Sequence, residues 1–254
     1  MPIAPAPLRE LARLVLPAEC PGCSAPDLLW CPGCAASFAG PPARVEAGVP
    51  RLDRLDGVAP LPVWALSRYE GTVRGVVVGW KDRGRADLDR MLAPAAARAA
   101  RRLRAALAAA AGTRPLLVVP APSSAASRRA RGRDHVLPVA RAVADAVGGV
   151  AAPVLQRVRG SQQVGLGARA RGANVGVRAD LRAVARAAAS TGTHGPPVCL
   201  VIDDVVTTGA TLAAAERALE QAGADVLGAL VLAATPTPGD SRPRGRTSDD
   251  TPWP

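Results

Sequence analysis

The stretch VCLVIDDVVTTGATL, residues 198–212, decides how the rest of the chain is interpreted. Its apolar, β-branched start predicts a buried strand, and an alanine-rich helical segment follows. Between them stand two adjacent acids, Asp203 and Asp204, and a loop rich in threonine and glycine. In a parallel sheet, this order puts the acids at the carboxyl end of a strand, where ligands bind. A single acid there usually caps a helix or makes a turn, but a pair followed by such a loop indicates a site.

The loop after the acids has the composition of a phosphate site. Backbone N–H groups at the start of the next helix favour an anion, and Thr207, Thr208 and Thr211 add hydroxyl donors. Gly209 allows a close approach to the backbone. The two carboxylates repel phosphate but suit sugar hydroxyls or bound Mg²⁺. We therefore predict a sugar phosphate as the ligand, with its phosphate in the loop and its diol at the acids.

A nucleoside triphosphatase can also place an acid after an apolar strand. Such an enzyme needs a phosphate-binding loop of the form GxxxxGK[ST]. The only lysine of this chain, Lys81, lies in GVVVGWKDRG, where the glycine spacing differs and no serine or threonine follows. The sequence therefore excludes this class.

Strand-like and helix-like segments alternate through most of the chain, which predicts an α/β fold with a parallel, helix-covered sheet. We expect three parts: an N-terminal module (1–57) with a helix at 8–16, one α/β domain (58–236) and a disordered tail (237–254). Residues 157–178 are glycine-punctuated and basic, and we expect a mobile lid there. The expected strands are 64–69, 115–119, 198–202 and 225–234, and the expected helices are 72–81, 87–111, 136–147 and 210–223.

Four of the five cysteines lie in CPGCSAPDLLWCPGC, and their CxxC-x₇-CxxC spacing predicts a structural Cys₄ zinc site. Disulfides and a redox CxxC are the alternatives. The first does not fit a reducing compartment, and the second does not fit two CPGC copies. Trp30 is expected to pack a small core around the metal, with stacking on nucleic acid as the alternative. The expected metal ligands are Cys20, Cys23, Cys31 and Cys34, whereas Cys199 is expected to be a small buried apolar residue.

The net charge of +11, from 32 basic and 21 acidic residues, favours polyanionic partners, although an arginine-rich composition explains it equally well. No apolar run reaches the roughly 20 residues that span a bilayer. The N-terminus lacks the pattern of a signal peptide. We therefore expect a cytoplasmic protein with no membrane insertion.

Four motifs in this order resemble the ComF family of the type I phosphoribosyltransferase superfamily. The stretch at 198–212 is similar to the family's motif for phosphoribosyl pyrophosphate (PRPP). Three further segments are similar to its Tyr-x-Gly…Lys-x-x-Gly, Pro-x-Pro…Arg-Gly and Gln-x-x-Leu…Arg-x-x-Asn patterns. The matching residues are Tyr69, Gly71, Lys81 and Gly84; Pro120, Pro122, Arg129, Arg131 and Gly132; and Gln163, Leu166, Arg171 and Asn174.

The resemblance implies a Rossmann-like parallel sheet with a flexible hood, and it implies roles for particular residues. The two acids would bind the ribose hydroxyls, and Mg²⁺ would accompany PRPP. The pyrophosphate and hood residues would be Lys81, Arg129, Arg131, Arg171 and Asn174. The PRPP-binding residues would be Asp203, Asp204, Val205, Val206, Thr207, Thr208, Gly209, Ala210 and Thr211, of which Asp203 and Asp204 would also be catalytic.

One segment departs from the family pattern. Where the family usually has Arg-Gly-Phe-Asn-Gln, this chain has Arg131, Gly132, Arg133, Asp134 and His135. We interpret His135 first as a local hydrogen-bonding partner of the adjacent aspartate, and otherwise as a base or a phosphate partner.

Two functions remain open at this stage. One is a PRPP-binding, zinc-containing protein that handles single-stranded DNA during uptake in natural competence, with a competence helicase as the partner that the resemblance implies. The other is an active PRPP-dependent phosphoribosyltransferase of nucleotide metabolism or salvage. Its reaction would need positioning and charge neutralisation more than a protein nucleophile.

Overall fold

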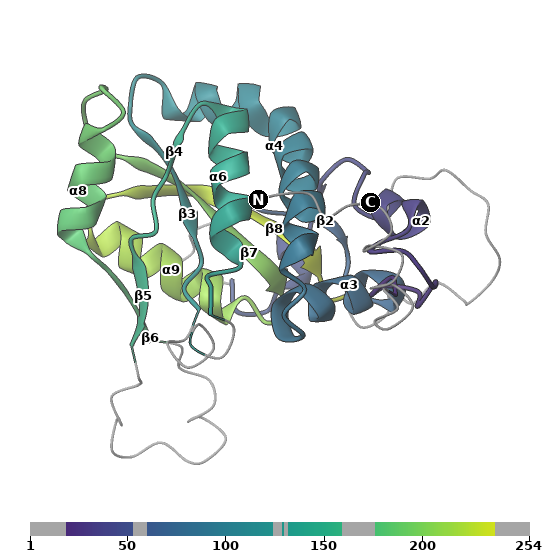
Figure 1. Ribbon diagram of the computed structural model, residues 1–254. Coiled ribbons are helices and arrows are strands. Elements are labelled where there is room, and N and C mark those ends of the chain that lie inside the picture. The colour runs from purple at the N-terminus through teal and green to yellow at the C-terminus, as the bar shows by residue number, and fades with distance from the viewer. Residues whose placement is uncertain (1–18, 53–59, 124–128, 130–131, 159–175, 237–254) are drawn as a thin grey trace, which may run out of the picture.

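The computed structural model describes residues 19–52, 60–123, 129, 132–158 and 176–236. The expected helix at 8–16, the middle of the expected lid and the tail at 237–254 lie outside these residues. The described chain forms a mixed α/β structure around a mostly parallel central sheet (Figure 1). Among these residues, no helix is long and apolar enough to cross a membrane.

The central sheet has the strand order β1-β2-β8-β7-β3-β4. All neighbouring strands in it run parallel except β1, which pairs with β2 in the antiparallel direction. The predicted parallel sheet is therefore confirmed. The strands are β1 (Ala43–Arg44), β2 (Val63–Arg68), β3 (Leu116–Pro120), β4 (Val150–Ala151), β7 (Val198–Val206) and β8 (Asp225–Ala234).

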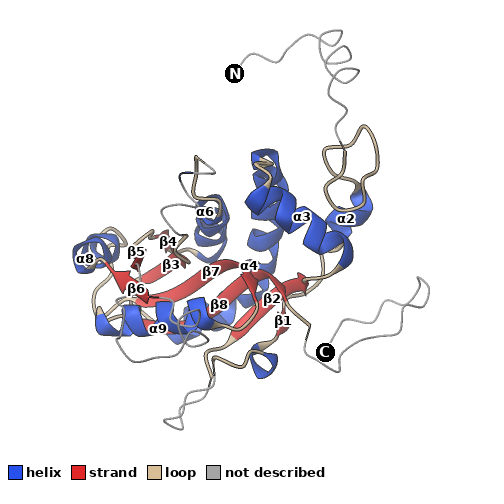
Figure 2. Ribbon diagram, turned by 90° about the horizontal axis from the view of Figure 1, so that it is seen from below, coloured by secondary structure: helices blue, strands red, loops and turns tan. Residues whose placement is uncertain are grey.

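Helices cover both faces of the sheet. The helices α3 (Gly71–Asp82), α4 (Asp89–Ala111) and α6 (Val136–Val147) lie on one face, and α9 (Ala210–Gln221) lies on the other (Figure 2). In β3, Leu116 and Val118 join the core under α4 and α6, whereas Leu117 and Val119 join the core under α9. Because successive side chains of a strand point to opposite faces, burial on both sides produces the continuous apolar runs seen in the sequence.

The connections open a crevice between β3 and β7. After β3 the chain passes through α6 to β4 on one side, and after β7 it passes through α9 to β8 on the other. Adjacent parallel strands whose connections leave in opposite directions form a topological switch point, where α/β proteins bind ligands. The strand β7 includes both acids and ends at Val206. The acids therefore lie near the carboxyl end of the strand rather than in the loop after it.

The structure differs from the sequence prediction at the base of the expected lid. Both ends of 157–178 are strands, because β5 (Leu155–Val158) pairs with β6 (Gly176–Ala179) in the antiparallel direction. The residues between them lie outside the described chain. The helix α8 (Leu181–Ala189), which follows β6, was not predicted, since its alanine and arginine content buries only Val184 fully.

Candidate ligand site and cysteine cluster

Two adjoining cavities, each of about 280 Å³, lie at the carboxyl ends of β3 and β7. One contains the acids together with Tyr69, Lys81 and the segment that follows β3. The other contains the loop between β7 and α9. Arg157, Asp203 and Thr207 line both, so the cavities form one continuous site. The switch point of the sheet therefore holds the acids and the predicted phosphate loop side by side.

The buried carboxylate of Asp204 contacts a lysine and a histidine. Lys81 Nζ lies 3.0 Å from Oδ1 and 2.8 Å from Oδ2, and His135 Nε2 lies 2.7 Å from Oδ2. We call these three residues the ion cluster. They come from the end of α3, the start of α6 and the end of β7. The ion cluster therefore joins two helices to the sheet that they cover. Burial acts to raise the pKa of Asp204, but His135 and Lys81 outweigh it and lower the pKa to about 2.

The pKa of Asp203 shifts in the opposite direction, although this residue directly precedes Asp204. Its side chain is half-buried and lines both cavities. Burial and the neighbouring charge of Asp204 raise the pKa of Asp203 to about 7, against the N–H of Asp204, which donates to its Oδ1 at 2.8 Å. Of the two acids, one is held ionised and the other titrates near neutral pH.

The loop from 207 to 211, which we call the Thr-Gly loop, presents donors to the second cavity. Thr207 and Thr208 are exposed, and Gly209 has the left-handed backbone conformation, with φ of +79°. Within the described part of the chain, the backbone N–H groups of Thr207, Thr208 and Gly209 have no hydrogen-bond partner. Because α9 begins directly after them, these groups and its dipole suit an anion.

The segment that breaks the family pattern is joined to the ion cluster. Arg133 donates to both oxygens of Asp89, at 2.7 and 2.6 Å, and Trp80 Nε1 donates to the same carboxylate at 2.6 Å. The Trp80 ring packs edge-on against His135, with 4.7 Å between the ring centroids. Arg133 and His135 therefore each contact an acid of another element.

The preferred interpretation of His135 as a local partner of Asp134 is wrong. The carboxylate of Asp134 instead accepts the N–H of Val136, the first residue of α6, at 3.2 Å. His135, only 1% exposed, contacts Asp204, which lies 69 positions away in the sequence. No local pattern could have shown this contact.

The other predicted site residues fall into three groups. Lys81, both acids and the Thr-Gly loop line the cavities. Arg129 is exposed, and three more predicted residues lie outside the described chain: Arg131, Arg171 and Asn174. Tyr69 and Arg157 line the first cavity without having been predicted as site residues, although one lies in a family motif and the other begins the expected lid.

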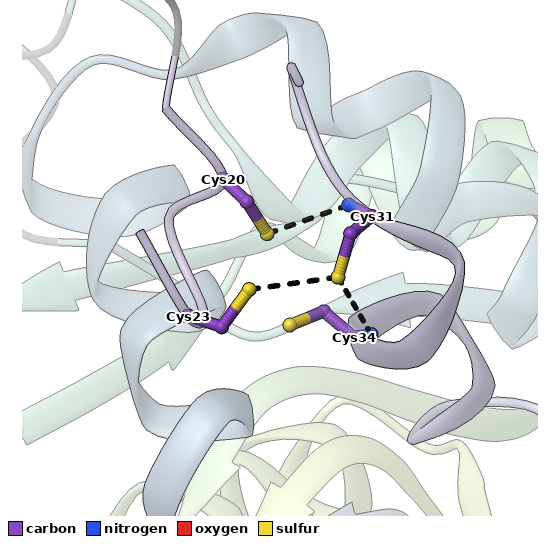
Figure 3. Close-up of side chains that lie close together, drawn as sticks. All are labelled: Cys20, Cys23, Cys31 and Cys34. Atoms are coloured by element: carbon purple, nitrogen blue, oxygen red, sulfur yellow. Dashed lines mark hydrogen bonds between the residues drawn. The ribbon is translucent and has the colours of Figure 1, made fainter. Parts of the chain in front are cut away.

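The four clustered cysteines converge on one point (Figure 3). All four sulfur atoms lie within 4.8 Å of one another, with 3.6 Å between Cys23 Sγ and Cys31 Sγ. Four thiolates bound to Zn²⁺ lie about 3.8 Å apart, since each Zn–S bond is about 2.3 Å long. The Cys31 N–H points to Cys20 Sγ, at 3.4 Å. The residues therefore fit a tetrahedral metal ion such as zinc.

The cysteine cluster packs on the helix that carries Lys81. A Cβ at Gly79 of α3 would lie 2.9 Å from Cβ of Pro21, so only glycine lets the first CPGC turn approach this closely. Trp30 is partly buried and packs as expected, but against the main core rather than a separate small core around the cysteines. Cys199 is fully buried in β7, also as expected, and burial raises the pKa of its thiol to about 12.

The comparisons with known proteins leave the family open. No family model matches the chain, and no curated protein matches it. The geometry of the site therefore carries the functional argument.

Proposed function

We propose that the chain is a ComF-like protein of type I phosphoribosyltransferase fold that binds PRPP. The observation that carries the proposal is the continuous site at the switch point, which joins the acids to the Thr-Gly loop. PRPP carries a diol and a 5′-phosphate on one ribose ring, so it needs hydrogen-bond acceptors and an anion site close together. An isolated phosphate or an isolated sugar would use only half of this surface.

Each part of the site has a role in this proposal. Asp203 and Asp204 accept hydrogen bonds from the ribose hydroxyls, and the Thr-Gly loop holds the 5′-phosphate. The pyrophosphate lies towards Pro122 and Ser123, which line the first cavity. Mg²⁺ accompanies PRPP and offsets the charge of the pyrophosphate.

Calorimetric titration with PRPP and Mg²⁺ tests the proposal. We expect the double variant Asp203→Ala/Asp204→Ala to bind at least about tenfold more weakly than wild type, because each lost hydrogen bond to a charged group contributes about 1.5–3 kcal/mol. Asp225→Ala is the matched control, since that acid lies at the far end of the sheet in an ion pair with Arg114. Equal affinity in all three proteins, or tighter binding of ATP than of PRPP, would contradict the proposal.

A catalytic role is the alternative use of the same site. Tyr69, Lys81 and Arg157 line the acid cavity, and in this alternative they would face a nitrogenous acceptor. Transfer of the phosphoribosyl group requires positioning and charge stabilisation, which this polar crevice supplies without a protein nucleophile. Pyrophosphate release in the presence of PRPP, Mg²⁺ and candidate bases would establish it. Binding of PRPP without turnover on any base would favour the binding role.

Single-stranded DNA is the second partner that we propose, with DNA uptake in natural competence as its setting. Arg90, Arg101 and Arg104 line a groove of about 660 Å³ between α4 and α6. Its rim also includes Asp145, so the groove suits a phosphate backbone only through its arginines. A competence helicase is the protein partner consistent with this setting.

Salt dependence tests the DNA proposal. We expect the affinity for an oligonucleotide to fall steeply between 50 and 200 mM salt, because each neutralised phosphate contributes a slope of about −0.7. Arg101→Glu/Arg104→Glu should reduce the affinity and the slope. Arg182→Glu/Arg186→Glu on α8 makes the same charge change on another helix. Affinity that is independent of salt would exclude this version.

We also propose that the cysteine cluster holds a structural zinc ion. All four coordination positions are filled by thiolates, which leaves none for a substrate. Elemental analysis of the purified protein should find one zinc ion per chain, and Cys23→Ser should reduce that content. Chelation should expose the peptide around 20–40 to proteolysis, because the metal contributes folding energy to small Cys₄ modules. A metal-free protein that resists proteolysis equally would refute a structural ion.

A further inference from the structure

The connector between the cysteine cluster and the sheet passes beside the Thr-Gly loop. It contains β1 and a short 3₁₀ helix, Glu46–Gly48. The Glu46 carboxylate accepts the N–H of Val63 at 3.2 Å, and this bond holds the connector to β2. The same carboxylate pairs with Arg44 within the connector. The connector is thus a fixed part of the described structure.

The connector contacts the Thr-Gly loop through its backbone and through apolar side chains. The N–H of Arg51 donates to Thr208 O at 2.9 Å. A Cβ at Gly209 would lie 2.5 Å from Val49 Cγ1 and 3.0 Å from Leu52 Cγ, and both of those side chains are buried. Gly209 is therefore required on two grounds: its positive φ and the close approach of the connector.

These contacts fix Arg51 at the phosphate side of the site. Its neighbours Val49 and Leu52 are buried on the loop, whereas Arg51 is exposed and lines the second cavity with Thr207, Thr208 and Arg157. A guanidinium group offers a planar fork of donors that matches two oxygens of a phosphate. The cavity thus combines the N–H groups of the Thr-Gly loop with a cation from the segment that joins β1 to β2.

We propose that Arg51 binds the 5′-phosphate of the ribose ligand, so that the N-terminal connector forms one wall of the site and selects phosphorylated ribose. This inference rests on the proposed function. The position of Arg51 in the second cavity assigns it to a small anion. The proposed pyrophosphate side, Pro122 and Ser123, lines only the other cavity, so Arg51 acts on one phosphate and not on both.

Titration of the full chain with ribose 5-phosphate and, separately, with pyrophosphate tests the inference. We expect Arg51→Ala to weaken ribose 5-phosphate binding by about tenfold to a hundredfold and to change pyrophosphate binding by less than about twofold. Arg51→Lys should recover only part of the loss, because it keeps the charge and loses the fork. Arg182→Ala, which removes an exposed arginine from α8, should match wild type.

The outcomes separate this inference from the proposed function. If wild type binds ribose 5-phosphate and Arg51→Ala binds it equally well, the inference fails and the proposed function stands. Equal losses for ribose 5-phosphate and pyrophosphate would show only a general effect of charge, and would also overturn it. If wild type binds no sugar phosphate, the proposed function fails. Inorganic phosphate is then the probe, and equal affinity in wild type and Arg51→Ala overturns the inference. Since the bond to Thr208 uses the Arg51 backbone, the side-chain variants are expected to fold normally.

Discussion

The ion cluster and the Thr-Gly loop lie in one continuous site, yet their polar groups are satisfied in different ways. In the ion cluster, Lys81 and His135 already contact the carboxylate of Asp204, which is 4% exposed. In the Thr-Gly loop, three successive backbone N–H groups have no partner within the described chain. One region therefore contributes to folding whether or not a ligand is present, and the other gains its partners from the ligand.

This difference separates stability from affinity within a single site. Where a group is paired inside the protein, removal of its partner lowers the free energy of unfolding. Where a group faces the cavity, water solvates it in the absence of ligand. Its removal therefore lowers the affinity for the ligand and not the free energy of unfolding. Variants of the Thr-Gly loop should therefore lower affinity alone, whereas variants of the ion cluster should lower stability whatever they do to affinity.

The largest expected effect is on folding, from Asp204→Asn. The substitution keeps the shape of the side chain but removes the charge that Lys81 and His135 share. We expect the free energy of unfolding to fall by about 2 kcal/mol, less than the loss for a fully buried pair because Lys81 reaches solvent. Urea denaturation measures it, with Thr207→Val as the control from the Thr-Gly loop. Equal stability of the two variants would remove the distinction between the regions.

The next effect is the pH dependence of stability, and it comes from Asp203. Its pKa in the folded chain, about 7, lies above the ordinary value of 3.8. Its stabilising contribution is therefore complete below about pH 4 and is lost as the pH rises through 7. Asp204, with its pKa lowered to about 2, contributes above about pH 4 and loses its contribution only as the pH falls through 2.

Thermal melts between pH 5 and pH 8 test this assignment. Wild type should lose stability over this range, whereas Asp203→Asn should show a flatter profile and exceed wild type by about 2 kcal/mol at pH 8. Neither His135 nor any other residue is altered in that variant, so a remaining slope of the same size would assign the titration elsewhere. Adjacent aspartates would then not differ in the way described.

A third prediction concerns affinity alone. Thr207→Val keeps the size of the side chain and removes a hydroxyl that faces both cavities. We expect PRPP to bind about tenfold more weakly, which corresponds to about 1.4 kcal/mol, and the free energy of unfolding to change by less than about 0.5 kcal/mol. Calorimetry and urea denaturation on the same preparation measure both quantities. A large loss of stability would place this threonine with the ion cluster.

The sequence predicted the elements with strong patterns and missed those whose partners are distant. The strands β3, β7 and β8 are continuous apolar runs, and α4, α6 and α9 have clear helical periodicity, so both classes were found. The short β4 and the weakly apolar α8 bury too little for a local pattern. At the site, the chemistry of the two acids and of the cysteines followed from spacing.

The arrangement around that chemistry did not follow from spacing. His135 meets Asp204, Arg133 meets Asp89, and Arg51 meets the Thr-Gly loop only because the sheet brings distant segments together. Each of these three contacts joins separate elements, and none has a fixed sequence separation. A single sequence therefore predicts which residues belong to this site better than it predicts which of them are in contact.

The smallest expected effect tests whether the ion cluster needs an imidazole at all. The resembled family usually has glutamine where this chain has His135, and the side-chain amide of glutamine can donate to the same oxygen of Asp204. We expect His135→Gln to lower the free energy of unfolding by less than about 1 kcal/mol, because the acceptor keeps a donor and only the edge contact with Trp80 changes.

His135→Ala is the matched contrast, because it leaves the Asp204 carboxylate with Lys81 and the N–H of Val205 and opens a buried space. Its loss should reach about 2 kcal/mol, and its pH profile near the acid limit should shift, since the pKa of Asp204 rises when a partner that lowers it is removed. Equal losses for the two variants would mean that packing of the ring, rather than donation to Asp204, is what the ion cluster requires. In that case the pKa of Asp204 would depend on Lys81, and the ion cluster would reduce to a single buried pair.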